Sequence, residues 1–163
     1  TVNDIWILIR RFLYTLGGAD ANENAIKLAR GYTGKHKILS RYRSYHGATF
    51  GALAATGDPR RVAWEPEVMP GVVHFLDPYR YRSTFHRTTP DISEEDFSLD
   101  YLNHLEEIIR FEGPQTIAAV LIEPVTGANG IIIPPLIISQ EELLEGFKII
   151  EDGLKITDAA VTL

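Results

Sequence analysis

The chain has 163 residues, with 16 Lys and Arg against 22 Asp and Glu, and therefore a formal net charge of -6. Its hydrophobic share of 45% and charged share of 23% are ordinary for one globular domain. No cluster of Lys and Arg forms a face, so we do not expect nucleic acid as a partner. The sequence has no cysteine, which excludes disulfides and thiolate zinc sites. This is compatible with a reducing cytosol, and we expect a cytoplasmic protein.

An apolar run, Ile5 to Ile9, stands near the start of the chain. It is far too short to span a bilayer. It is followed by Arg10 and Arg11, and not by the small residues that mark the cleavage site of a signal peptide. We therefore expect a soluble protein without a membrane partner.

Strand-like and helix-like segments alternate along the following sequence. Strands are predicted over 12–16, 37–42, 72–75 and 116–122, with a weaker candidate over 130–133. Helices are predicted over 19–31, 46–56 and 98–110. Gly31 and Gly57 stand where these helices are expected to stop. This alternation predicts an α/β fold, with a parallel-dominated sheet between flanking helices.

Two stretches between these elements, 57–71 and 77–96, are predicted to be long loops. The first contains the pair Arg60-Arg61, which is interpreted as solvated charge. The second carries aromatic side chains that are expected to pack on another surface: Tyr79, Tyr81 and Phe85.

The last part of the chain has the pattern of a separate helix. Ser139 to Glu142 matches a capping box, in which serine and glutamate bond each other's backbone N–H groups. Apolar residues then recur at helical spacing: Leu143, Phe147, Ile150 and Leu154. The sequence thus predicts a C-terminal helical segment over 136–163, separate from a domain over 12–135.

The run Gly17-Gly18-Ala19 stands directly before the first predicted helix. The first turn of a helix has backbone N–H groups without partners and a partial positive charge, so it suits a phosphate. Glycines let a ligand come close to the backbone. Taken alone, the run is more often a plain turn between a strand and a helix.

Polar and aromatic residues also follow two of the predicted strands. Tyr45 and His46 come after the strand over 37–42, and Glu123 comes after the strand over 116–122. Ligands of parallel α/β sheets bind at the carboxyl ends of strands, so these residues are candidates for a site. The alternative interpretation is a half-buried tyrosine, a hydrogen-bonded histidine and a carboxylate bound to nearby backbone. The five histidines lack the spacing of a metal site, so no metal is expected.

Four motifs stand in order along the chain: Gly-Gly-Ala-Asp-Ala-Asn-Glu-Asn-Ala-Ile-Lys-Leu-Ala-Arg at 17–30, Arg-Ser-Tyr-His-Gly-Ala-Thr at 43–49, Gly-Asp-Pro-Arg-Arg at 57–61 and Ile-Glu-Pro-Val-Thr-Gly at 122–127. Together they resemble the class III aminotransferases, which use pyridoxal phosphate. The likeness is greatest to members that pass an amino group from an amine or ω-amino acid to pyruvate. It covers roughly 12–135 and implies a partial large domain of the fold type I of pyridoxal-phosphate enzymes. The segment over 136–163 resembles the C-terminal helix that ends the family's small domain.

The resemblance implies a role for each candidate residue. Gly18 and Ala19 would present amides to the cofactor phosphate, Tyr45 would stack on the pyridine ring, and His46 and Glu123 would complete the cofactor site. It also implies a small amine and a keto acid as substrates. The two long loops are implied to support a homo-oligomer, or pairing with a full-length relative.

The sequence departs from the family at Pro134-Pro135, where it resembles a member whose middle has been removed. In the family, that middle carries the lysine that holds the cofactor as a Schiff base and the carboxylate on the pyridine nitrogen. None of the lysines present follows a strand end: Lys27, Lys35, Lys37, Lys148 and Lys155. We therefore expect an aminotransferase by family that is inactive as written, with no identifiable catalytic residue and weak cofactor binding at best. The alternatives are a non-catalytic dimerisation or interaction remnant, and a gene-model artefact.

Overall fold

The computed structural model describes residues 13–65, 68–123 and 126–127. Three parallel strands, in the order β2-β1-β3, form its sheet: β1 (Lys37–Arg41), β2 (Val72–Phe75) and β3 (Ile117–Leu121). The α-helices are α2 (Gly18–Thr33), α3 (Phe50–Ala55), α4 (Thr84–Thr88) and α5 (Glu94–Glu112). Short 3-10 helices lie at η1 (Pro59–Arg61), η3 (Arg80–Arg82) and η4 (Pro114–Thr116).

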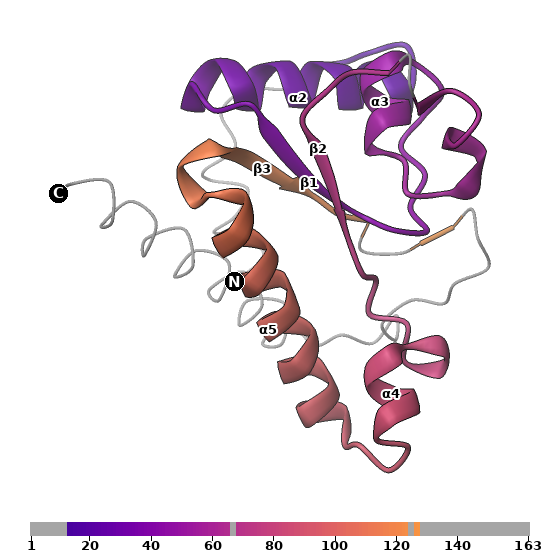
Figure 1. Ribbon diagram of the computed structural model, residues 1–163. Coiled ribbons are helices and arrows are strands. Elements are labelled where there is room, and N and C mark those ends of the chain that lie inside the picture. Colours follow the sequence, from indigo (N-terminus) through magenta and orange to yellow (C-terminus); the bar gives the residue numbers. More distant parts are fainter. Residues whose placement is uncertain (1–12, 66–67, 124–125, 128–163) are drawn as a thin grey trace, which may run out of the picture.

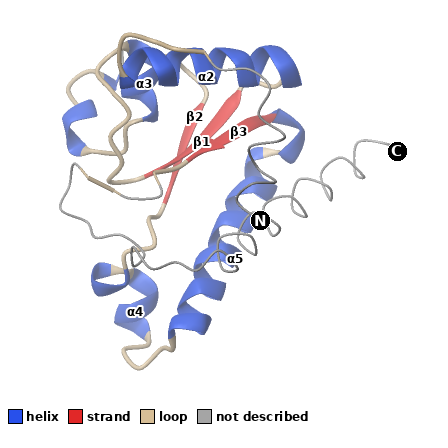
Figure 2. Cartoon of the chain, turned by 180° about the vertical axis from the view of Figure 1, so that it is seen from behind, coloured by secondary structure: helices blue, strands red, loops and turns tan. Residues whose placement is uncertain are grey.

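Helices lie on both faces of the sheet. Figure 1 shows α2 and α3 side by side on one face, and α5 on the other with α4 beside its start. Figure 2 shows the same layers from behind. The arrangement confirms the predicted α/β fold with a parallel sheet. In the described part of the chain, no helix combines the length and apolarity that crossing a membrane requires.

The central strand β1 is apolar on both faces because helices cover both. Ile38 and Leu39 are only 1% and 0% exposed, as expected for a strand buried inside a parallel sheet. Ile38 packs with Ile26 of α2 and with Ala55. The parallel register places the ends of β1 and β3 at the same edge, so the segments that follow them are neighbours.

Three of the predicted strands are confirmed, over 37–42, 72–75 and 116–122. The strand predicted over 12–16 is wrong for residues 13–16, which have no regular structure. A strand needs a neighbour to pair with, and residues 13–16 pair with none of the three described strands. Leu13, Tyr14 and Leu16 are 64%, 89% and 102% exposed instead. Residue 12, the candidate strand over 130–133 and the helical segment over 136–163 lie outside the described residues.

The helix ends differ from the predicted ones in identifiable ways. Gly31 does not stop α2, which continues to Thr33, and Gly34 ends it in the left-handed conformation at φ 68°. The helix predicted over 46–56 begins only at Phe50. The helix predicted over 98–110 begins earlier, at Glu94, because the Ser93 hydroxyl accepts a hydrogen bond from the Asp96 amide at 3.0 Å.

The predicted long loops contain more regular structure than expected. The stretch over 57–71 includes η1, and the stretch over 77–96 includes η3, α4 and the start of α5. The prediction of a loop over 77–96 is therefore wrong for the residues of η3, α4 and the start of α5. Of the aromatic rings in this stretch, Phe85 packs on Phe97 of α5 as expected, with centroids 6.4 Å apart. Tyr79 and Tyr81 instead contact each other at 6.1 Å, and Tyr81 is 72% exposed.

Candidate functional site

The start of α2 lies directly against the segment that follows β1. A Cβ atom placed on Gly47 would stand 2.6 Å from the Cβ of Ala19, and the φ of Gly47 is 134°. Glycine is therefore required there both for space and for backbone conformation. The Asn22 side-chain amide also donates a hydrogen bond to the His46 carbonyl at 2.7 Å. These contacts fix the position of the first turn of α2.

The segment after β3 is tied to the same place. The Tyr45 backbone N–H donates to Oε1 of Glu123 at 2.7 Å. The Arg41 guanidinium donates to the Glu123 carbonyl at 2.8 Å and to the Thr126 hydroxyl at 2.9 Å. The structure thus brings the three predicted segments together, and with them all five candidate residues: Gly18, Ala19, Tyr45, His46 and Glu123.

The first turn of α2 is open. Gly17, the N-cap residue, has an extended backbone and offers no side-chain hydrogen bond to the turn. A Cβ on Gly17 or Gly18 would meet no atom within 4 Å. The arrangement leaves room for an anion at amides that the N-cap side chain does not satisfy.

Tyr45 is 38% exposed, and a cation lies over its ring. The centre of the Arg60 guanidinium is 4.4 Å from the ring centroid. Asp58 holds this guanidinium by two contacts, 2.7 Å to Nε and 3.1 Å to Nη2. The interpretation of Arg60-Arg61 as solvated charge was therefore incomplete for Arg60. It was wrong for Arg61, whose side chain is only 14% exposed and lies over the ring of Tyr42.

His46 is buried within the loop, at 6% exposure. Its backbone N–H donates to the Thr56 hydroxyl at 3.0 Å, and its Nε2 has no hydrogen-bond partner. Burial, followed by the nearby charges of Arg41 and His74, lowers the pKa of His46 to about 4. The imidazole is therefore neutral at pH 7.

Glu23 is a site residue that sequence reasoning missed. Its Oε1 accepts hydrogen bonds from the Thr49 hydroxyl at 2.5 Å, the Gly51 amide at 2.7 Å and the Ala52 amide at 3.1 Å. It thereby caps the start of α3 from α2. Burial raises the pKa of Glu23, but the hydrogen bonds outweigh it and the pKa is lowered. Glu23 lay inside the motif at 17–30, but no local pattern linked it to residues 26 or more positions away.

None of the described lysines lies at these loops. Lys37 Nζ donates to the carbonyl of Glu112 at 2.6 Å and to its carboxylate at 2.8 Å, at the amino end of β1. At about 3.3 Å per residue, this end is roughly 13 Å from the carboxyl end of the strand. Lys35 lies two residues further back, and Lys27 is about 14 Å along α2 from Gly18 at about 1.5 Å per residue. Lys148 and Lys155 lie outside the described residues.

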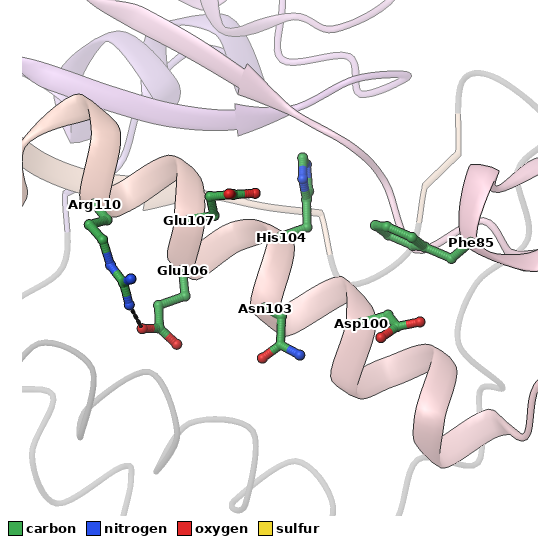
Figure 3. A pocket seen from close by; sticks show the side chains of 7 residues that line it. All are labelled: Phe85, Asp100, Asn103, His104, Glu106, Glu107 and Arg110. Carbon is green, nitrogen blue, oxygen red and sulfur yellow. Dashed lines mark hydrogen bonds and ion pairs between the residues drawn. The ribbon is translucent and has the colours of Figure 1, made fainter.

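A hollow elsewhere on the surface does not involve the candidate residues. It lies along α5, where Arg110 pairs with Glu106 at 2.6 Å (Figure 3). Its lining residues are Phe85, Asp100, Asn103, His104, Glu106, Glu107 and Arg110. Within the described residues, no three or more His, Asp or Glu side chains are grouped so that they could hold a metal ion.

Comparisons with known proteins all point to one family. The family model described as "Aminotransferase class-III" matches residues 4–148. A solved taurine:2-oxoglutarate aminotransferase from Bifidobacterium kashiwanohense, in complex with PLP and glutamate, is 44% identical, with a TM-score of 0.71 over 85% of this chain and 30% of that one. An (S)-enantioselective omega-transaminase from Thermomicrobium roseum is 38% identical, with a TM-score of 0.70 and the same coverage of 85% and 30%.

The curated relatives agree with the solved structures. Gamma-aminobutyrate transaminase 1, mitochondrial, of Oryza sativa subsp. indica is 38% identical over 131 residues, which are 77% of this chain and 25% of the relative. The chain thus spans about a quarter of the length of the curated relatives it matches.

Proposed function

The chain belongs to the class III aminotransferase family, and on this premise we propose that its three converging loops hold the phosphate and one ring face of pyridoxal phosphate. One observation carries the proposal. The Tyr45 amide is bonded to Glu123 at 2.7 Å while the neighbouring Gly47 lies against Ala19, so the first turn of α2 and an aromatic ring lie at one sheet edge.

The described residues fit such a ligand in three respects. Open space above Gly17 and Gly18 can take a phosphate at the positive end of α2. The partly exposed Tyr45 ring can pack on a flat heteroaromatic ring. Oε2 of Glu123 is buried without a hydrogen-bond partner, and a polar ligand group can supply one.

When bound, pyridoxal phosphate supplies the electron sink through which an amino group passes between an amine and a keto acid. The part played by this chain is binding and orientation. The first-turn amides hold the phosphate, Tyr45 sets the plane of the ring, and Glu123 fixes the loop that carries Tyr45. For the whole enzyme we propose an amine or ω-amino acid as donor and a keto acid such as pyruvate as acceptor.

We propose that this chain alone does not transfer an amino group. Lys27, Lys35 and Lys37 lie away from the loops, and Lys37 is engaged by Glu112. We therefore propose that none of the lysines in the described part of the chain forms a covalent bond to the cofactor.

Cofactor binding is tested by titrating the purified chain with pyridoxal phosphate and following absorbance. Saturable binding that inorganic phosphate competes away is the expected result. Tyr45→Ala and Gly18→Asp should each weaken it, the first by removing the ring and the second by placing a negative charge at the phosphate position. Phe111→Ala is the matched control, because it removes an aromatic ring that is 80% exposed on α5, away from the loops. Binding that is not saturable, or that these two variants leave unchanged, would overturn the proposal.

Covalent attachment is tested separately. The chain is mixed with pyridoxal phosphate and reduced with borohydride, and the intact protein is weighed. We expect no stoichiometric adduct. Full labelling of a single lysine would show that the chain carries a cofactor lysine after all.

A second candidate function is association with another chain, as an interaction remnant without catalysis. It is favoured by the outer face of α2, where Leu28 and Tyr32 lie one turn apart and are 62% and 94% exposed. Size-exclusion chromatography with and without a full-length relative tests this candidate, and a lone monomer in both runs would count against it.

A further inference from the structure

Arg41 is a buried cation at the end of β1. The residue is only 7% exposed, and its side chain points into the region between the segments that follow β1 and β3. Burying a guanidinium is costly unless hydrogen bonds or charges compensate for the lost water. The partners it keeps therefore indicate what the residue does.

Those partners belong to the segment after β3. Nη2 of Arg41 donates to the backbone carbonyl of Glu123 at 2.8 Å and to the hydroxyl of Thr126 at 2.9 Å. One rigid planar group thus holds two acceptors that are three residues apart in the chain. The position of the Glu123 backbone relative to β1 is fixed in this way.

The Glu123 side chain passes this restraint on to Tyr45. Its Oε1 accepts the Tyr45 backbone N–H at 2.7 Å. On the other side, the Ser44 hydroxyl donates to the Arg41 carbonyl at 2.7 Å and accepts from the Gly57 amide at 3.1 Å. The bonds run from Arg41 through Glu123 to Tyr45 and back through Ser44, so they form a closed loop.

We infer that Arg41 is a positioning residue, whose guanidinium fixes the Glu123 segment so that the carboxylate can hold the Tyr45 loop and present its ring. Arg41 acts through Glu123 and does not contact the ligand. The relevance of this to pyridoxal phosphate rests on the proposed function, whereas the bonds themselves can be measured in the ligand-free chain.

The direct test measures hydrogen exchange of the Tyr45 amide by NMR in Arg41→Met, which keeps the side-chain length but removes the donors. If the Tyr45 N–H loses its bond to Glu123, its exchange should become about tenfold faster. The amides of Leu39 and Val73, which lie in the paired strands β1 and β2, should change by less than about twofold. Arg110→Met is the matched control, because that arginine is exposed on α5 and pairs with Glu106.

Two results would overturn the inference. One is unchanged Tyr45 exchange in folded Arg41→Met. The other is an equal rise at Tyr45, Leu39 and Val73, which would mean general destabilisation. If Arg41→Met does not fold, Thr126→Val decides, because it removes one of the two acceptors with little change of shape. It should speed Tyr45 exchange less but in the same direction, and no change there would overturn the inference.

A binding experiment separates this inference from the proposed function. Pyridoxamine phosphate is the probe, because it lacks the aldehyde and cannot label lysines. Arg41→Met should weaken its binding several-fold and leave inorganic phosphate binding unchanged, because the phosphate lies at α2. If the unaltered chain does not bind the probe, the proposed function fails, and Tyr45 exchange alone then decides on Arg41. Equal weakening of both ligands would overturn the positioning role.

Discussion

At the residue scale, the Glu23 side chain joins α2 to α3, the two helices on one face of the sheet. It accepts three hydrogen bonds at the start of α3, where Thr49 is the N-cap residue but makes no side-chain cap bond of its own. A carboxylate from another helix thus replaces the usual local cap. The first backbone N–H groups of the short helix α3 have no local side chain to bond to, and the Glu23 carboxylate accepts from two of them.

Glu23→Ala should lower the free energy of unfolding at pH 7 by about 1 to 2 kcal/mol, the usual loss for a removed cap. Because the pKa of Glu23 is lowered in the folded chain, its charge stabilises the fold above the ordinary pKa of 4.5. That contribution is lost as the pH falls through the folded-state pKa. Urea unfolding of both proteins at pH 7 and at about pH 3 measures the difference. If Glu23→Ala lowered the free energy of unfolding equally at both pH values, the charge of Glu23 would not be what stabilises the fold.

His46 should make the fold sensitive to mild acid. Its pKa is about 4 in the folded chain and near its usual 6.5 when unfolded. Between pH 4 and pH 6.5 the unfolded chain binds more protons than the folded chain. The free energy of unfolding therefore has its full value, as far as His46 is concerned, above pH 6.5 and declines as the pH falls toward 4. The loss should reach about 2 to 3 kcal/mol, which urea unfolding across this range would detect.

His46→Gln should flatten this dependence without abolishing it. Burial also lowers the pKa of His74 and of His104, so both contribute to the slope in the same direction. His36→Gln is the matched control, since His36 is exposed. An equal slope in the unaltered chain and in His46→Gln would show that the His46 imidazole does not cause it.

At the scale of elements, the end of α2 allows a test with two glycines three residues apart. Gly31 lies within the helix, and Gly34 lies at its end with φ 68°. At either position a Cβ would meet no atom within 4 Å, so backbone conformation decides the outcome. Gly31→Ala should stabilise the chain by roughly 0.5 to 1 kcal/mol. Gly34→Ala should destabilise it by about 1 kcal/mol. Urea unfolding measures both changes. The reverse result, with Gly31→Ala destabilising and Gly34→Ala stabilising the chain, would place the helix end at Gly31.

Elements were predictable where the pattern was local. The strand over 72–75 and the helix α2 follow from short-range periodicity and from the glycine run before the helix. The strand predicted over 12–16 had an equally apolar pattern, but its residues 13–16 have no partner strand among the described residues. Apolar composition indicates that a segment can be a strand, whereas pairing decides whether it becomes one.

At the scale of the whole molecule, the exposed apolar residues should cause association. Leu28 and Tyr32 lie one turn apart on α2 and are 62% and 94% exposed, so they form an exposed apolar face. Sedimentation velocity should therefore detect species larger than the monomer whose share grows with concentration. Leu28→Lys combined with Tyr32→Lys should shift the population toward monomer. Lys27→Glu, a change of charge on the same helix, is the control. A monomer at all concentrations would contradict this expectation.

The sequence by itself determined the family, the α/β class and the identity of the candidate residues, because the motifs are contiguous and each is read within a few positions. It also placed Tyr45, His46 and Glu123 after strand ends, where parallel sheets gather their ligands, whereas the strand expected before Gly18 and Ala19 is absent over 13–16. The tertiary structure alone decided how they are held: Glu23 capping α3, Arg41 bridging to Glu123, and His46 buried and neutral. These contacts join residues 26 to 82 positions apart, or depend on burial, so they exist only once the sheet and its helices have assembled.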